Sequence, residues 1–222
     1  MSRPKAILFD AGGTLVTMDP ARFGDIVEPI IGSRPTPELM VEAHYRAMDA
    51  ITRNSHLVTS GVATWWPWWL GQYLEYSGLE AHPDAVAELS VSHELWRAPL
   101  PGALDGVRAV KDAGFQVAVV SNADGTVDKD LAAAGFRDLI DVVIDSTLAG
   151  VSKPDPAIFT FALEALGVAP EEAWYVGDSA LFDLQGAQAA GLSEFVLVDP
   201  LGLQNYRPHV ATVGELPGLL GG

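Results

Sequence analysis

Short apolar runs alternate with helical patterns along most of the chain. Five runs have the length and composition of buried strands: KAILF (5–9), FQVAVV (115–120), DVVID (141–145), AWYVG (173–177) and EFVLV (194–198). Between the later runs, apolar residues recur at helical spacing and each such segment ends near a glycine. Alternating strands and helices favour right-handed crossovers and a parallel sheet covered on both faces. The pattern therefore predicts an α/β fold with a Rossmann-like parallel sheet.

Residues 17–98 do not follow this alternation. They contain no comparable strand run, and the stretches ELMVEAHYRAMDAI and DAVAELSVSHELW have helix-favouring compositions. We predict an all-helical domain at 17–98, inserted into a core formed by 1–16 and 99–222. The tryptophan-rich stretch WWPWW, residues 65–69, is expected to pack inside this helical domain. The alternative is that some of its rings face a cleft or form a dimer patch.

Composition narrows the classes of partner. The 222 residues are 49% hydrophobic, which suffices for a packed core, and they carry a formal net charge of −16. Such a charge repels phosphate backbones and anionic lipid, so we expect neither a nucleic-acid partner nor a membrane partner. The most apolar stretch, LVTSGVATWWPWWL, is too short to span a bilayer, and cysteine is absent. We expect a cytoplasmic protein, either a monomer or a homodimer.

Polar residues cluster where the predicted strands end. In parallel sheets, ligands bind outside the carboxyl ends of the strands. The residues at or near this edge are Asp10, Ser121, Asn122, Lys153, Asp178 and Asp183. Neighbouring carboxylates repel one another unless a cation neutralises them, and such hard oxygen ligands suit Mg²⁺. The Lys153 amine and the Ser121 hydroxyl could then hold the oxygens of a phosphate group.

Four motifs in this order carry a family resemblance. The segments FDAGGTL, VVSNADG, GVSKPDP and VGDSALFD closely resemble the four signature motifs of the haloacid dehalogenase-like (HAD) hydrolase superfamily. The resemblance covers residues 5–16 and about 99–200. The helical insertion occupies the position of that family's cap domain. Each motif alone is a weak signal, but the four together at strand ends form a specific pattern.

The resemblance implies roles for individual residues. Asp10 matches the nucleophile that forms a covalent aspartyl intermediate. Ser121 matches the hydroxyl that binds the transferring phosphoryl group, with the backbone of Asn122 beside it. Lys153 matches the lysine that steadies the nucleophile and the phosphate. Gly12 and Gly13 of the first loop are likewise implied to lie against the phosphate.

The resemblance also implies a Mg²⁺ site. Asp178 matches a direct ligand, together with the Asp10 carboxylate and the backbone carbonyl of Gly12. Asp183 matches the second acid of the last motif, which orients the other groups more than it binds the ion. Thr14 matches the small residue that stabilises the first loop. The implied activity is Mg²⁺-dependent hydrolysis of a small phosphorylated metabolite.

One position departs from the phosphatase pattern. Phosphatases of this superfamily usually have Asp-x-Asp in the first motif, whereas the second acid here is replaced by Gly12. General acid–base help of that kind contributes roughly 10²–10⁴-fold. We therefore expect slow turnover, a preference for good leaving groups such as acyl or aryl phosphates, or a proton supplied by the cap. Candidate donors in the cap are Glu42, His44 and His56.

Two alternatives stay open. A 2-haloacid dehalogenase attacks carbon without a metal, and the tryptophan-rich cap with Arg22 as a halide clamp would suit it. The Gly177–Asp178 pair argues against this alternative, because true dehalogenases lack it. Replacement of the acid at Gly12 motivates the second alternative, a non-catalytic phosphate-binding protein. The presence of Asp10, Lys153 and Asp178 argues against that reading, because binding alone needs no nucleophile.

Overall fold

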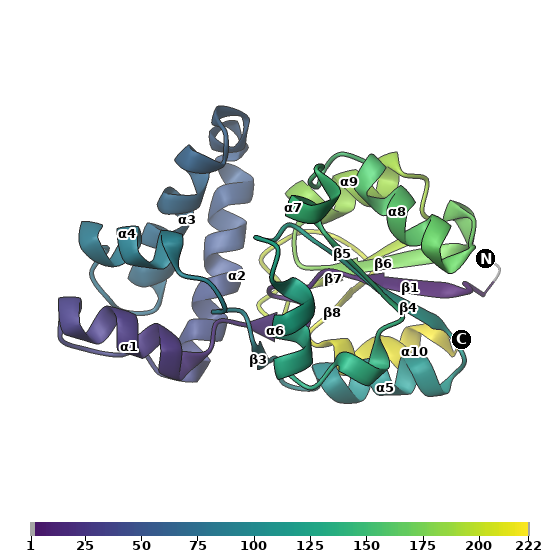
Figure 1. The fold of residues 1–222 in the computed structure, drawn as a ribbon, viewed down its shortest axis with the longest axis horizontal. Coiled ribbons are helices and arrows are strands. Elements are labelled where there is room, and N and C mark those ends of the chain that lie inside the picture. Colours follow the sequence, from purple (N-terminus) through teal and green to yellow (C-terminus); the bar gives the residue numbers. More distant parts are fainter. Residues whose placement is uncertain (1–2, 222) are drawn as a thin grey trace.

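A six-stranded parallel sheet forms the larger part of the molecule. The computed structural model describes residues 3–221, and the strand order is β5-β4-β1-β6-β7-β8 (Figure 1). The strands are β1 (Ala6–Phe9), β4 (Gln116–Ser121), β5 (Val142–Asp145), β6 (Ala173–Gly177), β7 (Glu194–Val198) and β8 (His209–Val210). The predicted fold class is confirmed, and the short strand β8 is an addition that no apolar run indicated.

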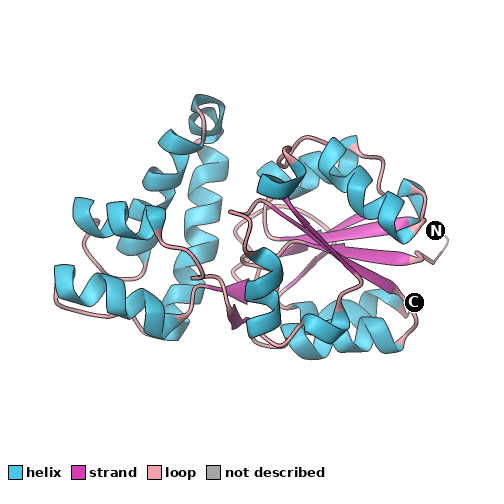
Figure 2. Ribbon diagram, viewed as in Figure 1, coloured by secondary structure: helices cyan, strands magenta, loops and turns pink. Residues whose placement is uncertain are grey.

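Helices cover both faces of this sheet (Figures 1 and 2). The helices of the core are α5 (Ala103–Asp112), α6 (Val127–Ala133), α7 (Ser146–Ala149), α8 (Ala157–Leu166), α9 (Gln185–Ala189) and α10 (Leu216–Leu220). The side chains of strand β1 pack against helices on both faces of the sheet. Ile7 and Phe9 pack in one cluster with α5, while Ala6 and Leu8 pack in another with α8. Successive side chains of a strand point to opposite faces, so an uninterrupted apolar run indicates burial on both.

Four helices form a separate group beside the sheet, at the left in Figure 1. They are α1 (Pro20–Ile31), α2 (Pro37–Arg53), α3 (Val62–Tyr76) and α4 (Pro83–Val91). Their own apolar cluster includes the buried side chains of Phe23, Met40, Trp69 and Tyr73. A two-residue antiparallel pair, β2 (Val16–Thr17) with β3 (Ala98–Pro99), joins the two chain segments that enter and leave this group.

Local signals explain where the helices of this group begin. The Asp19 side chain accepts hydrogen bonds from the backbone of residues 21 and 22 at the start of α1, and Pro20 is the first helical residue. Thr36 caps α2 in the same way, followed by Pro37. Such side chains satisfy backbone N–H groups that have no partner within the helix, and proline is tolerated there. None of the helices within residues 3–221 is long and apolar enough to cross a membrane.

Candidate functional site

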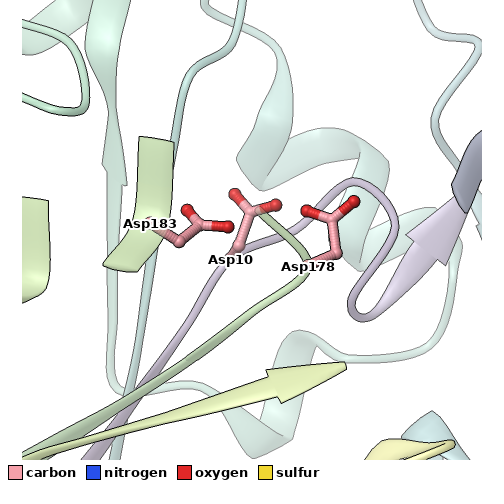
Figure 3. A group of neighbouring side chains, drawn as sticks. All are labelled: Asp10, Asp178 and Asp183. Carbon is pink, nitrogen blue, oxygen red and sulfur yellow. The ribbon is translucent and has the colours of Figure 1, made fainter. Parts of the chain in front are cut away.

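The carboxyl ends of the central strands bring together the polar residues singled out above. Phe9 is in register with Val119 of β4 and with Val176 of β6. Asp10 directly follows β1. The register therefore places it next to Ser121 on one side and next to Asp178 on the other, offset by one residue along the strands. Asp183 comes from a short π-helical turn after β6, Ala180–Leu184. Figure 3 shows Asp10 between the other two carboxylates.

Lys153 links two of these carboxylates. Its Nζ atom lies 2.5 Å from Oδ1 of Asp10 and 2.6 Å from Oδ1 of Asp183. It also donates to the Tyr175 hydroxyl at 2.9 Å, and that hydroxyl donates to the carbonyl of Val120 at 2.8 Å. All three donors of the ammonium group are thereby directed at named acceptors. The amine is held in one position against the carboxylate of Asp10.

Burial shapes the electrostatics of the cluster. Loss of water raises the pKa of the Asp10 carboxyl, although the adjacent Lys153 opposes the shift. Burial likewise raises the pKa of Asp183 to about 7. Burial acts to lower the pKa of Lys153, but the neighbouring Asp10 and Asp183 carboxylates outweigh it and raise that pKa. Three carboxyl groups with one ammonium group leave the site short of positive charge.

Lys153 is also fixed through its own backbone. The side chain of Asn122 donates to the Lys153 carbonyl at 3.0 Å and accepts from the Lys153 amide at 2.7 Å. This reciprocal pair ties the loop before α8 to the end of β4. The Asn122 side chain thus positions Lys153. The family resemblance of the sequence had implied only that the Asn122 backbone lies beside the phosphoryl group. Ser121, the residue before it, ends β4 and is buried.

A helix of the inserted group reaches into this site. Nε2 of His44, in α2, lies 2.6 Å from Oδ2 of Asp178, and both side chains are buried. The next residue, Tyr45, donates its hydroxyl proton to the carbonyl of Gly13 at 2.8 Å. Gly13 has a φ of +76°, and a Cβ there would lie 2.0 Å from Nε2 of His44. Only glycine lets α2 approach the first loop this closely.

Gly12 faces an aromatic ring. A Cβ at this position would lie 3.1 Å from Cε3 of Trp96, which is tighter than ordinary van der Waals contact. Trp96 belongs to the segment that returns from α4 to the core. A side chain at residue 12 would therefore crowd the indole of Trp96, which would have to shift by a few tenths of an ångström.

The donor set fits a hard divalent cation. Oxygen atoms of Asp10, Asp178 and Asp183 all lie within 4.8 Å of one another. Carboxylate oxygens are the ligands that Mg²⁺ prefers, and a cation would correct the charge imbalance. Asp183 already directs Oδ1 at Lys153 and accepts the amide of Ser179 with Oδ2. Asp10 and Asp178 are therefore the better placed to bind an ion directly.

Other candidates from the sequence lie elsewhere. Arg22 is exposed and pairs with Glu94, so it does not reach the buried carboxylates as a halide clamp would. Glu42 pairs with Arg46 along α2, and His56 is exposed in the turn after it. Of the three proton donors considered in the cap, His44 alone contacts the acidic cluster. The Thr14 hydroxyl is buried without a hydrogen-bond partner, so it does not bond the loop.

Sequence reasoning missed two polar residues of the site. Tyr175 lies inside a strand that is otherwise apolar, and its buried hydroxyl contacts Lys153. A buried tyrosine hydroxyl needs a partner, and this was the one available signal. Gln204 donates to the backbone carbonyl of Asp178 at 2.7 Å from a loop beyond β7. Nothing in the local pattern around residue 204 indicated that contact.

Comparison with known proteins gives a family match over most of the chain. The model of the haloacid dehalogenase-like hydrolases matches residues 4–191. Haloacid dehalogenase-like hydrolase domain-containing protein 3 of Homo sapiens is 35% identical over 187 residues, covering 79% of this chain and 72% of that protein. A phosphoglycolate phosphatase of Thiobacillus denitrificans is 28% identical, covering 92% of this chain and 86% of that enzyme.

Solved structures share the whole fold. A dehalogenase with an intermediate complex matches with a TM-score of 0.68 and 24% identity, covering 100% of this chain and 99% of that one. The HAD-hydrolase YfnB from Bacillus subtilis, bound to magnesium, matches with a TM-score of 0.71 and 20% identity, covering 99% of each chain. At these identities the likeness concerns the arrangement of sheet and helices.

Proposed function

Because the chain belongs to the haloacid dehalogenase-like hydrolase family, we propose that it is a Mg²⁺-dependent phosphatase acting on a small phosphorylated metabolite. One observation carries this proposal. The Asp10 carboxylate, at the end of β1, is held against Lys153 beside two further buried carboxylates. Relatives named as phosphatases, including the phosphoglycolate phosphatase, support the reaction class.

Asp10 is the proposed nucleophile. One of its oxygens forms a bond to phosphorus while the ester P–O bond breaks, giving an aspartyl phosphate and an alkoxide that takes a proton from water. A second water then attacks phosphorus, which frees Asp10 and releases inorganic phosphate and a proton. That proton neutralises the hydroxide left by the first water. Overall, one phosphate ester and one water become one alcohol and one phosphate ion.

The neighbouring residues hold the groups that react. Lys153 keeps the Asp10 carboxylate oriented and counters negative charge that develops on the phosphoryl oxygens. Ser121, at the end of β4, and the first loop with Gly12 and Gly13 would contact the other phosphoryl oxygens. Mg²⁺, held by Asp10, Asp178 and the Gly12 carbonyl with Asp183 behind them, would offset the charge of nucleophile and phosphate.

The inserted helices are proposed to act as a cap. We assign 17–98 to the cap and 1–16 with 99–222 to the core. Asp10, Lys153 and Asp178 are almost completely buried. The substrate can therefore enter only when the helical group moves away from the sheet, and its return excludes water from the site. We further propose that the protein acts in the cytoplasm as a monomer or homodimer, which accords with its lack of cysteine.

Phosphate release tests the proposed reaction. Wild type should release phosphate from a panel of phosphate esters with Mg²⁺ and lose this activity with a chelator. Asp10→Asn should be inactive, whereas Asp138→Asn, at an exposed acid of the core, should match wild type. Acid quenching should trap a phosphoenzyme in wild type and in Asp138→Asn, but not in Asp10→Asn. Metal-independent halide release from 2-haloacids would instead support a dehalogenase, and no turnover with no phosphoenzyme would support a binding protein.

Gly12 provides a second, more specific test. Introducing an acid by Gly12→Asp alone should give little gain on alkyl phosphates, because the new side chain would crowd Trp96. The double variant Gly12→Asp with Trp96→Ala should be faster than Trp96→Ala alone, by up to roughly 10²-fold. Equal rates for those two variants would show that a missing acid does not limit turnover.

A further inference from the structure

A chain of aromatic rings runs from the core turn after β6, through helix α3, to the segment that follows α4. We call Phe182, Trp65, Trp66, Trp69 and Trp96 the aromatic arch. Successive ring centroids lie 5.4 Å apart for Phe182 and Trp65, 5.8 Å for Trp65 and Trp66, 5.2 Å for Trp66 and Trp69, and 6.2 Å for Trp69 and Trp96. Trp66 and Trp69 stack with an interplanar angle of 9°.

Both ends of the aromatic arch lie at catalytic loops. Phe182 is the neighbour in sequence of Asp183, and Trp96 packs against the backbone at Gly12. His44, which contacts Asp178, lies beside the Trp96 end of the arch, with its ring 5.5 Å from Trp69 and 5.6 Å from Trp96. Trp69 and Phe182 are buried, whereas Trp65, Trp66 and Trp96 keep part of their surface exposed. The arch therefore forms an apolar wall of differently tilted rings beside the carboxylates that would receive the phosphoryl group.

The cap offers no spare cation beside this surface. Residues 17–98, all of them described by the structure, contain no lysine, and each of their five arginines pairs with a carboxylate. These pairs are Arg22 with Glu94, Arg34 with Asp25 and Glu28, Arg46 with Glu42, Arg53 with Asp49, and Arg97 with Glu94 and Asp130. A second anionic group on a substrate, such as a carboxylate, would meet no unpaired lysine or arginine there.

Two buried ring nitrogens of the same region lack partners. Nδ1 of His44 and Nε1 of Trp69 are both buried without a hydrogen bond, and the two rings are neighbours. A buried polar atom without a hydrogen bond is unfavourable, so such atoms usually bond to water or to a ligand. These two atoms give the otherwise apolar arch the capacity to bind a neutral hydrogen-bonding group.

We propose, resting on the phosphatase function above, that the substrate's leaving group is uncharged and carries a flat aromatic ring that packs against the half-buried rings of the aromatic arch, Trp65, Trp66 and Trp96. Aromatic side chains favour stacked and edge-to-face contacts with other rings. A carboxylate-bearing phosphate ester would lose its hydration on entering the closed site and gain no ion pair in return. The arch thus selects benzyl-type phosphate esters over small acidic ones.

Two substrates separate ring recognition from leaving-group chemistry. Benzyl phosphate and 2-phosphoglycolate both release alkoxides of alcohols, so the absence of an acid at Gly12 should handicap both. Wild type should show a kcat/KM for benzyl phosphate at least about tenfold above that for 2-phosphoglycolate. Trp96→Leu should bring this ratio toward one. Trp68→Leu is the matched control, because Trp68 lies in the same helix as Trp66 and Trp69 but outside the arch, and it should keep the wild-type ratio.

A binding measurement keeps this proposal independent of turnover. Calorimetry with Mg²⁺ present should show benzylphosphonate binding at least about tenfold more tightly than phosphonoacetate, and Trp96→Leu should remove the difference. If benzylphosphonate binds more tightly but no phosphate ester is hydrolysed, the phosphatase function is rejected while the preference for an aromatic ring is supported. Equal or better use of 2-phosphoglycolate, or equal or tighter binding of phosphonoacetate, would overturn the proposal.

Discussion

At the scale of single residues, Gly13 shows how tightly the cap meets the core. Its positive φ costs most other residues, alanine included, about 1–2 kcal/mol, whatever surrounds it. Its missing side chain also leaves room for the His44 ring and for Oδ2 of Asp178, which a Cβ would approach to 2.0 and 2.5 Å. The cost of a positive φ can be measured apart from the cost of crowding at Gly114. That residue has a φ of +87°, but an added Cβ would meet nothing within 4 Å.

We expect Gly13→Ala and Gly114→Ala to differ. Gly114→Ala should lower the free energy of unfolding by about 1 kcal/mol, from backbone strain alone. Gly13→Ala should lower it by at least about 2 kcal/mol more, because His44 or the loop must also move. Urea denaturation of both variants measures the difference. Equal losses would mean that α2 is not held against the loop in solution.

At the scale of elements, one carboxylate ties a helix to two strands. Asp141, just before β5, accepts the Val117 amide of β4 at 2.8 Å and pairs with Lys111 near the end of α5. Partial burial acts to raise the pKa of Asp141, but Lys111 and the Val117 amide outweigh it and lower that pKa below 3.8. A carboxyl whose pKa is lowered by folding stabilises the protein above its unfolded pKa, and this stabilisation is lost as pH falls through the folded pKa.

Asp141→Asn should therefore have a pH-dependent effect. At pH 7 we expect a Tm a few degrees below that of wild type, because the ion pair with Lys111 is lost. The gap should close as pH falls below about 4, where the wild-type carboxylate takes up its proton. Thermal melts between pH 2.5 and 7 measure it, with Asp112→Asn, at an exposed acid, as the control. A gap that persists at the lowest pH would contradict the electrostatic cause.

At the scale of the whole molecule, a few polar contacts hold the cap against the core. His44 contacts Asp178, the Tyr45 hydroxyl bonds Gly13, and Arg97 pairs with Asp130 at 2.6 Å. The first two come from adjacent residues of α2 and meet the loops that carry the acidic cluster. Their loss should favour an open arrangement, because the apolar cluster of the cap includes neither of the two side chains from α2.

The double variant His44→Ala with Tyr45→Phe tests this. We expect the radius of gyration from small-angle scattering to rise above that of wild type, while the circular dichroism spectrum stays unchanged. His56→Ala, at an exposed cap residue, should leave the radius unchanged. A double variant as compact as wild type would show that apolar contacts alone, such as Trp65 with Phe182, keep the cap closed.

Much of the core could be predicted because its signals are local. The five apolar runs agree with β1, β4, β5, β6 and β7 to within one residue at each end. Strand β8 and the pair β2–β3 were missed, since two-residue strands depend on their partners and leave no periodic pattern. Asp10 and Asp178 could be named because each directly follows a run. Tyr175 could not, because its place beside Lys153 arises from the packing of separate segments.

The order of apolar and polar residues, by itself, determined the parallel sheet, the helical insertion, the family and the edge at which chemistry should occur. These features follow from interactions among near neighbours in the chain and from the rule that parallel strands end together. Only the tertiary structure decided that His44 contacts Asp178, that Trp96 packs against Gly12, and that every cap arginine is paired. Those contacts join segments far apart in sequence, and their geometry depends on how whole helices pack.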